Sequence, residues 1–175
     1  AIEKSNAWIV KPDSLNFFDY QIEAINEWKA QDFQGIFDMA TGTGKTLTAL
    51  GALELLCKEP HGNSGVIIVC PYQHLVEQWV EEIVAFNILP IICYSSYNWK
   101  KQFKTTISDF KYGVIKNFCV ITTNDTLATD YFQNEIDKLK GNICLVVDEA
   151  HNFGARKQLD CMKDLYKYRL ALSAT

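Results

Sequence analysis

The sequence has little that would place it in a membrane or in a secreted, disulfide-bonded protein. Its 175 residues contain no apolar run near the roughly 20 residues that a membrane-spanning helix needs. Residues 1–6 contain no apolar segment of the kind that a secretory signal requires. The six cysteines never form a C-x-x-C pair and only three histidines accompany them, which gives no zinc-site pattern. We therefore expect a protein of the reducing cytoplasm without membrane contact.

An excess of positive charge is also missing. The chain has 17 Lys and Arg residues against 21 Asp and Glu residues, and its formal net charge is −4. Proteins that coat nucleic acid through a broad surface are basic instead. The charge balance therefore counts against a nucleic-acid partner but does not exclude one. If nucleic acid is the partner, the contacts must be local or lie on other parts of a longer protein.

Strand-like and helix-like segments alternate along the chain, which is typical of an α/β fold. Apolar runs predict strands at 8–10, 35–38 (buried), 66–70, 90–94, 118–122, 143–148 and 168–172. Helical periodicity predicts helices at 17–28, 45–58, 73–86, 130–139 and 157–167, and a basic, solvated helix face at 99–104 where a phosphate contact stays open. The sequence predicts one domain over residues 1–175, with a central parallel sheet and helices on both faces. Such sheets bind ligands beyond the carboxyl ends of their strands.

The most informative stretch is 38–47, Asp-Met-Ala-Thr-Gly-Thr-Gly-Lys-Thr-Leu, which follows a predicted strand and opens a predicted helix. Small residues at Ala40, Gly42 and Gly44 let the backbone curl, so that successive N–H groups converge on one anion. The positive end of the helix dipole falls at the same place. This stretch is interpreted as a phosphate-binding loop of the Walker type.

The residues after the glycines supply charge and a metal ligand. Lys45 offers a mobile ammonium for the outer phosphates, and the hydroxyl of Thr46 suits the ligand shell of Mg²⁺. Met39 stands where the strict pattern has its first Gly. The alternative is a glycine-rich strand-to-helix turn with an incidental lysine.

A second signal follows a predicted buried strand, where the chain reads Asp148-Glu149-Ala150-His151. A carboxylate at the end of such a strand, downstream of a phosphate loop, commonly holds Mg²⁺, and Asp148 is assigned that role. Glu149 lies one residue further, where it can orient or deprotonate a water that attacks the terminal phosphorus. The alternative is that the two acids form the N-terminal cap of a helix.

Three stretches together resemble motifs I, II and III of the superfamily-two helicases of the DEAD/DEAH-box type. They are residues 39–46 (Met-Ala-Thr-Gly-Thr-Gly-Lys-Thr), 148–151 (Asp-Glu-Ala-His) and 173–175 (Ser-Ala-Thr). Members of that family commonly carry Ala or Met at the first Gly position, so Met39 fits the resemblance. Similarity to the helicase subunits of type I and type III restriction enzymes and to related DNA repair helicases rests on residues within 20–28, 75–79 and 152–155.

The resemblance implies a RecA-like P-loop NTPase domain with ATP and Mg²⁺ as cofactors, and it assigns roles to individual residues. Those expected to bind the nucleotide are Gln21, Thr41, Gly42, Thr43, Gly44, Lys45 and Thr46. Those expected in catalysis are Lys45, Asp148 and Glu149, with Thr46 and Asp148 holding Mg²⁺. Those expected to couple the nucleotide state to the grip on nucleic acid are His151, Ser173 and Thr175.

Nucleic-acid contacts are implied at two further stretches. Pro71 to Gln78 resembles motif Ia, and Thr122 with Thr123 resembles motif Ib, both of which touch the sugar-phosphate backbone of one strand. Hydroxyl groups and backbone N–H groups suit that role because they bind phosphates without reading sequence. Without the resemblance, both stretches are ordinary strand-to-helix loops.

Four positions bear on how far these assignments carry. Gln21 is implied to read the adenine edge, since its amide donates and accepts at once, whereas in isolation it would be taken for a plain surface residue. Relatives often have Arg where this chain has Phe18, which puts the adenine-binding side of the nucleotide pocket in question. Tyr72 replaces a common Thr of motif Ia, and Asn124 replaces a common Tyr after motif Ib, which weakens the nucleic-acid assignments.

The resemblance implies the N-terminal ATP-binding half of a nucleic-acid-dependent ATPase, either a helicase or a translocase, that acts on DNA rather than RNA. It also implies a second RecA-like domain with an arginine finger, which is worth ~10³–10⁵ in turnover. Residues 1–175 alone are therefore expected to bind Mg–ATP weakly and to hydrolyse it negligibly. The alternatives are an ATP-gated switch or scaffold without helicase activity, which the acidic balance favours, and a duplex-DNA translocase subunit of a restriction system.

Overall fold

The computed structural model describes residues 8–60, 62–95, 98–154 and 160–174. The strands are β1 (Gln34–Asp38), β2 (Ser64–Cys70), β3 (Ile91–Cys93), β4 (Asn117–Thr123), β5 (Asn142–Val147) and β6 (Tyr166–Ser173). The helices are α1 (Asp19–Ala30), α2 (Lys45–Cys57), α3 (Gln73–Ile83), α4 (Lys100–Lys111), α5 (Asn124–Leu127) and α6 (Asp130–Ile136), with 3₁₀ turns η1 (Val84–Phe86) and η2 (Ala150–Asn152). The strands form one sheet in the order β1-β6-β5-β2-β4-β3, and every pair is parallel.

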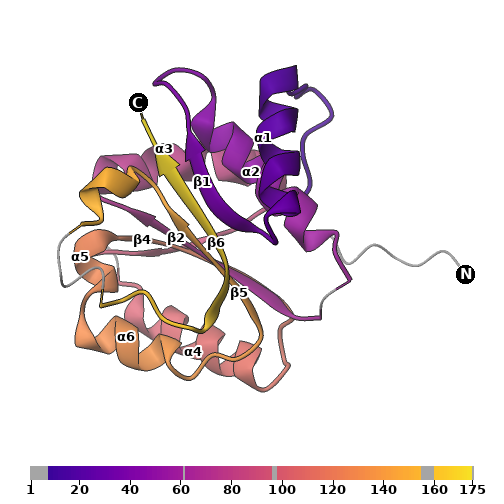
Figure 1. Ribbon diagram of the computed structural model, residues 1–175. Coiled ribbons are helices and arrows are strands. Elements are labelled where there is room, and N and C mark those ends of the chain that lie inside the picture. The colour runs from indigo at the N-terminus through magenta and orange to yellow at the C-terminus, as the bar shows by residue number, and fades with distance from the viewer. Residues whose placement is uncertain (1–7, 61, 96–97, 155–159, 175) are drawn as a thin grey trace, which may run out of the picture.

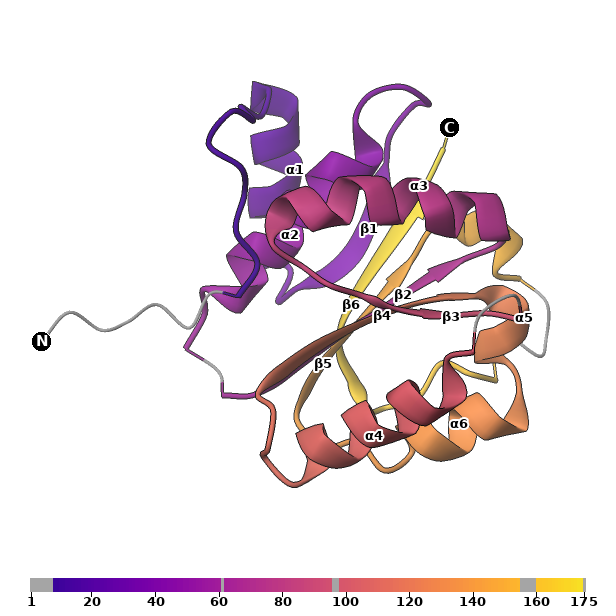
Figure 2. The ribbon, with the colours of Figure 1, turned by 180° about the vertical axis from the view of Figure 1, so that it is seen from behind.

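Helices cover both faces of the sheet. Helices α1, α2 and α3 lie on one face, whereas α4, α5 and α6 lie on the other (Figures 1 and 2). Strand β2 shows how one strand serves both layers: Val66 and Ile68 pack toward the first helix layer, and Ile67 and Val69 pack toward the second. A strand that is covered on both faces needs a continuous apolar run, because successive side chains alternate between the faces. The predicted α/β architecture is confirmed.

Strand β1 differs from the prediction of a buried strand. Among the described residues it pairs only with β6, so it forms one edge of the sheet. Only Phe37 of this strand is buried, and the side chain of Ile36 is 58% exposed. The phosphate loop therefore begins at the edge of the sheet.

Two predicted elements are wrong. Residues 8–10 form no strand; Ile9 is buried in the core, and the N–H of Val10 donates to Phe86 O at 3.0 Å. Residues 160–165 are turn and irregular backbone rather than part of a helix over 157–167, whose residues 157–159 lie outside the described part. Strand β6 begins at Tyr166, because the burial alternates from there with the two-residue period of a strand.

The basic stretch 99–104 does begin a helix. Trp99 precedes α4, whose residues Phe103 and Ile107 are buried while Lys100 and Lys104 are exposed.

No helix within the described ranges has the length and apolar character needed to cross a bilayer. All six cysteines are buried free thiols, and four of them lie in strands. Burial raises the pKa of Cys119 and of Cys144, so both behave as small apolar side chains.

Candidate functional site

The phosphate loop joins the carboxyl end of β1 to the first turn of α2. Gly42 and Gly44 adopt positive φ angles of 82° and 77°, which side chains rarely tolerate. A Cβ atom on Gly44 would also lie 2.8 Å from Nε2 of Gln21. The loop is fixed at its start, where the N–H of Met39 donates to Ser173 O at 3.0 Å. These glycines hold the loop in the tight curl that phosphate binding requires.

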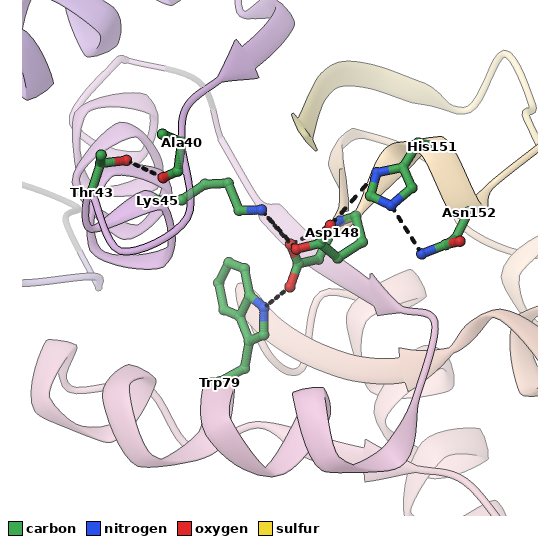
Figure 3. Close-up of polar contacts among 8 residues, drawn as sticks. Ala40, Thr43, Lys45, Trp79, Asp148, His151 and Asn152 are labelled. Atoms are coloured by element: carbon green, nitrogen blue, oxygen red, sulfur yellow. Dashed lines mark hydrogen bonds and ion pairs between the residues drawn. The ribbon is translucent and has the colours of Figure 1, made fainter. Parts of the chain in front are cut away.

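The first residue of α2 carries the only positive charge among the described residues that line the cavity beside this loop. The Nζ atom of Lys45 lies 2.8 Å from Oε1 of Glu149 and 3.8 Å from Oδ1 of Asp148 (Figure 3). One ammonium and two carboxylates leave one excess negative charge at this point. Glu149 is thus the nearest ion-pair partner of Lys45 in this cluster.

Asp148 is held in place by three hydrogen bonds. Its N–H donates to Val69 O at 2.8 Å, which fixes it at the end of β5 beside β2. Its Oδ2 accepts the indole N–H of Trp79 at 2.9 Å, and its Oδ1 accepts the N–H of Glu149 at 2.8 Å (Figure 3). The Asp148 side chain is nearly buried, so its orientation is fixed before any ligand arrives.

Glu149 has an unusual backbone for a residue with a side chain. Its φ of 48° and ψ of 54° lie in the left-handed region, which costs roughly 1–2 kcal/mol for a residue other than Gly. The residue precedes the short turn η2, and its side chain makes no capping hydrogen bond there. Glu149 therefore occupies the N-cap position of η2, as the alternative expects, but its side chain does not cap the turn. His151 follows, with its Nδ1 at 3.6 Å from Glu149 Oε2 and its Nε2 at 3.3 Å from Nδ2 of Asn152.

The residues present fit a magnesium ion. Thr46 and Asp148 line one cavity of about 350 Å³ together with the phosphate loop, and hydroxyl and carboxylate oxygens are the ligands that Mg²⁺ takes. No group of three or more His, Cys, Asp or Glu side chains that would hold a metal occurs in the described part of the chain. Mg²⁺ commonly takes only one or two carboxylates from a protein and keeps water and substrate phosphates as its other ligands.

Helix α1 is tied to the phosphate loop by two side chains. Tyr20 Oη donates to Thr43 O at 2.6 Å, and Gln21 Nε2 donates to Thr48 Oγ1 at 2.9 Å. Oε1 of Gln21 accepts the N–H of Phe18, and the side chain is 4% exposed. Gln21 is therefore a buried brace of the loop rather than a plain surface residue, and its contact with adenine stays a prediction.

The four residues predicted to touch nucleic acid do not lie together. Pro71 and Thr123 line a second cavity at the carboxyl ends of β2 and β4. Thr122 is fully buried, and its hydroxyl donates to Cys93 O at 2.7 Å inside the sheet, so its predicted contact is wrong. Gln78 lines the cavity of the phosphate loop, because the helical turn of α3 directs it toward α2. Its contact with nucleic acid stays a prediction.

Three of the remaining predicted residues have specific places. Thr41 lines the cavity with the glycines of the loop, and the Thr43 hydroxyl donates to Ala40 O within the loop at 2.6 Å. Ser173 lies at the end of β6, where its carbonyl accepts from Met39. Thr175 lies outside the described residues.

Sequence reasoning missed Trp79 and Glu82, both on α3. The contact between Trp79 and Asp148 joins residues 69 positions apart, which no local pattern shows. Glu82 lines the loop cavity with Gln78, and the four-residue spacing of the two on one helix was the available signal. Burial, and next the charge of Glu81, raise the pKa of Glu82. Its Oε2 atom is buried without a hydrogen-bond partner in the described residues.

We expect Trp79→Phe to lower the affinity for Mg²⁺ in the presence of nucleotide by about tenfold. The lost hydrogen bond to the charged Asp148 is worth about 1.5–3 kcal/mol, and each 1.4 kcal/mol corresponds to roughly tenfold in affinity. Titration of Mg²⁺ at fixed nucleotide concentration measures this. The matched control is Trp28→Phe, since Trp28 is also buried and donates its indole N–H to Arg169 O at 2.9 Å. Equal shifts in both variants would assign the effect to packing and contradict the role of Trp79 in holding Asp148.

Comparison with solved structures shows the same fold in larger proteins. One match is a nuclease-deletion mutant of the Type ISP restriction-modification enzyme LlaGI in complex with a DNA substrate mimic, with a TM-score of 0.75 and 21% identity over 92% of this chain and 18% of that chain. Another is the ATP-dependent Type ISP restriction-modification enzyme LlaBIII bound to DNA, with a TM-score of 0.71 and 19% identity over 93% of this chain and 13% of that chain. A third is the Sulfolobus solfataricus SWI2/SNF2 ATPase core in complex with double-stranded DNA, with a TM-score of 0.70 and 22% identity over 97% of this chain and 33% of that chain. At these identities the likeness establishes the fold, a RecA-like core, and the chain spans a third or less of each of these proteins.

Sequence comparison establishes the family. No curated protein matches the chain. The family described as "Type III restriction enzyme, res subunit" matches residues 14–175, which is nearly the whole sequence. The resemblance to superfamily-two helicases of restriction enzymes is thereby confirmed, and the chain belongs to the ResIII family.

Proposed function

We propose that this chain is the N-terminal ATP-binding half of a DNA-dependent ATPase that translocates on DNA or unwinds it. The observation that carries the proposal is the cluster of Lys45, Asp148 and Glu149, which the fold brings together from the start of α2 and the end of β5. A protein that only bound nucleotide would need the loop and Lys45. Hydrolysis additionally requires a group that activates water, and Glu149, which has a strained backbone beside the cavity, is placed to serve as that group.

Each residue of the cluster has one task in the proposed reaction. The loop N–H groups and Lys45 bind the β- and γ-phosphates, and Lys45 exchanges Glu149 for a phosphate oxygen. Thr46 and Asp148 would hold Mg²⁺, which would offset the negative charge of the phosphates. Glu149, released from Lys45, orients the attacking water and accepts its proton. Gln21 and Tyr20 keep the loop in position through their hydrogen bonds with Thr48 and Thr43, and Gln21 is proposed to contact the adenine.

Several observations support DNA as the polymer. The family is described by a restriction-enzyme subunit, and the solved structures named above are described with DNA, a DNA substrate mimic or double-stranded DNA. We extend the proposal to a second RecA-like domain that completes the ATPase, with residues 1–175 as one domain. Six buried free thiols suit a reducing cytoplasm as the site of action. His151 and Ser173 are proposed to couple the two activities through their contacts with Glu149 and Met39.

The test has two parts. Binding of a fluorescent ATP analogue to residues 1–175, with and without Mg²⁺, tests the nucleotide site. ATP hydrolysis by the full-length protein is then measured with no polymer, single-stranded DNA, duplex DNA and RNA at several salt concentrations. Stimulation by DNA supports the proposal. Hydrolysis or binding that no polymer changes would instead identify an ATP-gated switch, which the net charge of −4 favours.

A further inference from the structure

Three carboxylates line the nucleotide cavity, and they differ in their partners. Asp148 accepts hydrogen bonds on both of its oxygens, whereas Glu149 contacts Lys45 with one oxygen and His151 with the other. Oε2 of Glu82 is buried and accepts no hydrogen bond from the described residues. A buried acceptor of this kind in a native protein commonly marks a place for a water or an ion. Glu82 is thus the carboxylate of this cavity that is available to a ligand.

Glu82 lies beside the residue that orients Asp148. Trp79 precedes Glu82 by three positions on α3, which makes the two side chains neighbours on the helix surface. The indole of Trp79 points from α3 to Asp148, to which it donates at 2.9 Å (Figure 3). Glu82 also lines the cavity that contains Thr46 and Asp148, the two residues that would hold Mg²⁺. Helix α3 therefore brings a second acid into the cavity of the expected metal.

The charges of the cavity favour a cation near Glu82. Among the described residues that line the cavity, the three carboxylates are opposed by Lys45 alone. Nζ of Lys45 lies 2.8 Å from Glu149 and 3.8 Å from Asp148, so its charge is directed at these two acids. Burial, and next the charge of Glu81, raise the pKa of Glu82, as expected of a carboxyl group that lacks a cationic partner. A dication in the cavity would stabilise its ionised form.

Contact with the metal through a water fits this arrangement better than direct ligation. No group of three or more His, Cys, Asp or Glu side chains in the described ranges converges closely enough to hold a metal, so the three carboxylates do not share one ion directly. Mg²⁺ keeps several of its waters, and these waters donate hydrogen bonds outward. Side chains that accept such hydrogen bonds orient the shell of the metal, and replacing them typically costs about 10- to 100-fold in metal affinity.

We propose that Glu82 is a positioning residue for Mg²⁺, which accepts a hydrogen bond from a water of the metal's shell while Thr46 and Asp148 bind the metal itself. This inference rests on the proposed function, because it specifies how the same site holds the metal of Mg–ATP. It gives α3 two tasks at the metal: Trp79 orients a ligand, and Glu82 orients a water.

The test separates binding of the metal from binding of the nucleotide. The affinity of residues 1–175 for a fluorescent ATP analogue is measured in EDTA, and the affinity for Mg²⁺ is measured by titration at saturating analogue. We expect Glu82→Ala to lower the affinity for Mg²⁺ by about 10- to 100-fold. Without metal, this variant should bind the analogue at least as tightly as the wild type, because a carboxylate that faces the phosphates is removed. A merely structural role would weaken both kinds of binding.

Two further variants refine the assignment. Glu82→Gln keeps the volume of the side chain and one acceptor oxygen but loses the charge, so it should lose less Mg²⁺ affinity than Glu82→Ala. Glu81→Gln is the matched control, because Glu81 is the neighbouring acid on α3, is exposed and does not line the cavity. The control should bind both Mg²⁺ and the analogue as the wild type does.

Three outcomes would overturn the inference. They are wild-type Mg²⁺ affinity in Glu82→Ala, an equal loss of analogue binding without metal in that variant, and analogue binding by the wild type that Mg²⁺ does not change. Failure of the proposed function has a different signature, since the wild-type chain itself would then not bind the analogue in the presence of Mg²⁺.

Discussion

Lys45→Ala is expected to lower the affinity of the chain for Mg–ATP by about 10- to 100-fold. A hydrogen bond to a charged group contributes about 1.5–3 kcal/mol, and each 1.4 kcal/mol corresponds to roughly tenfold in affinity. The cavity gives the loss a second cause. Of the described residues that line it, Lys45 alone is positive, whereas Glu82, Asp148 and Glu149 are acidic. Without Lys45, these carboxylates would face the phosphates of the nucleotide with no basic side chain of the cavity lining between them.

Calorimetry or a fluorescent ATP analogue measures this loss. Lys58→Ala is the matched control, because Lys58 also forms an ion pair, with Glu54 at 3.0 Å, but lies at the far end of α2. The control should bind Mg–ATP as the wild type does. Wild-type affinity in Lys45→Ala would show that the loop does not bind phosphates and would remove the basis of the proposed function.

Glu149→Gln is expected to separate binding from hydrolysis. The amide cannot accept a proton from water, and a positioned general base typically contributes about 10²–10⁴ in rate. The same change removes the ion pair of 2.8 Å that holds Lys45. Because Lys45 is then released toward the phosphates, affinity for Mg–ATP should be at least that of the wild type. Turnover by the full-length protein in the presence of DNA should fall by about 10²- to 10⁴-fold.

Glu59→Gln is the control for this variant. Glu59 forms an ion pair with Lys29 at 2.7 Å and does not line the cavity. The Glu59→Gln variant therefore tests the effect of breaking an ion pair alone. It should change neither affinity nor turnover. If Glu149→Gln retained DNA-stimulated turnover, water activation would have to be assigned to another group, and Glu82 in the same cavity would be the next to test.

Local patterns predicted the centre of the fold and most of the residues that meet around the loop cavity. The apolar run 66–70 became the core strand β2, because helices cover both of its faces. The segment from Met39 to Gly44 lies between β1 and α2, as its glycines indicate. Here the signal is local, since neighbouring residues determine both burial and backbone shape.

Features that depend on distant contacts were not predictable. The exposure of Ile36 follows from the place of β1 at the sheet edge, and strand order is set by contacts between distant segments. Asp148 was identified from its position after a strand, but the indole that orients it belongs to Trp79 on α3, which is distant in sequence. Gln78 was assigned with Pro71 because both lie in the stretch that resembles motif Ia. The helix that begins between them directs them into different cavities.

The burial of all six cysteines makes the natural chain suitable for site-specific labelling. Thiol reagents attack the exposed thiolate, and burial raises the pKa of Cys57, Cys70 and Cys119 while shielding their sulfur atoms. A single cysteine introduced at an exposed position, such as Tyr112, would therefore react with a maleimide dye in preference to the native thiols. Single-molecule fluorescence could then follow this protein without first replacing its own cysteines.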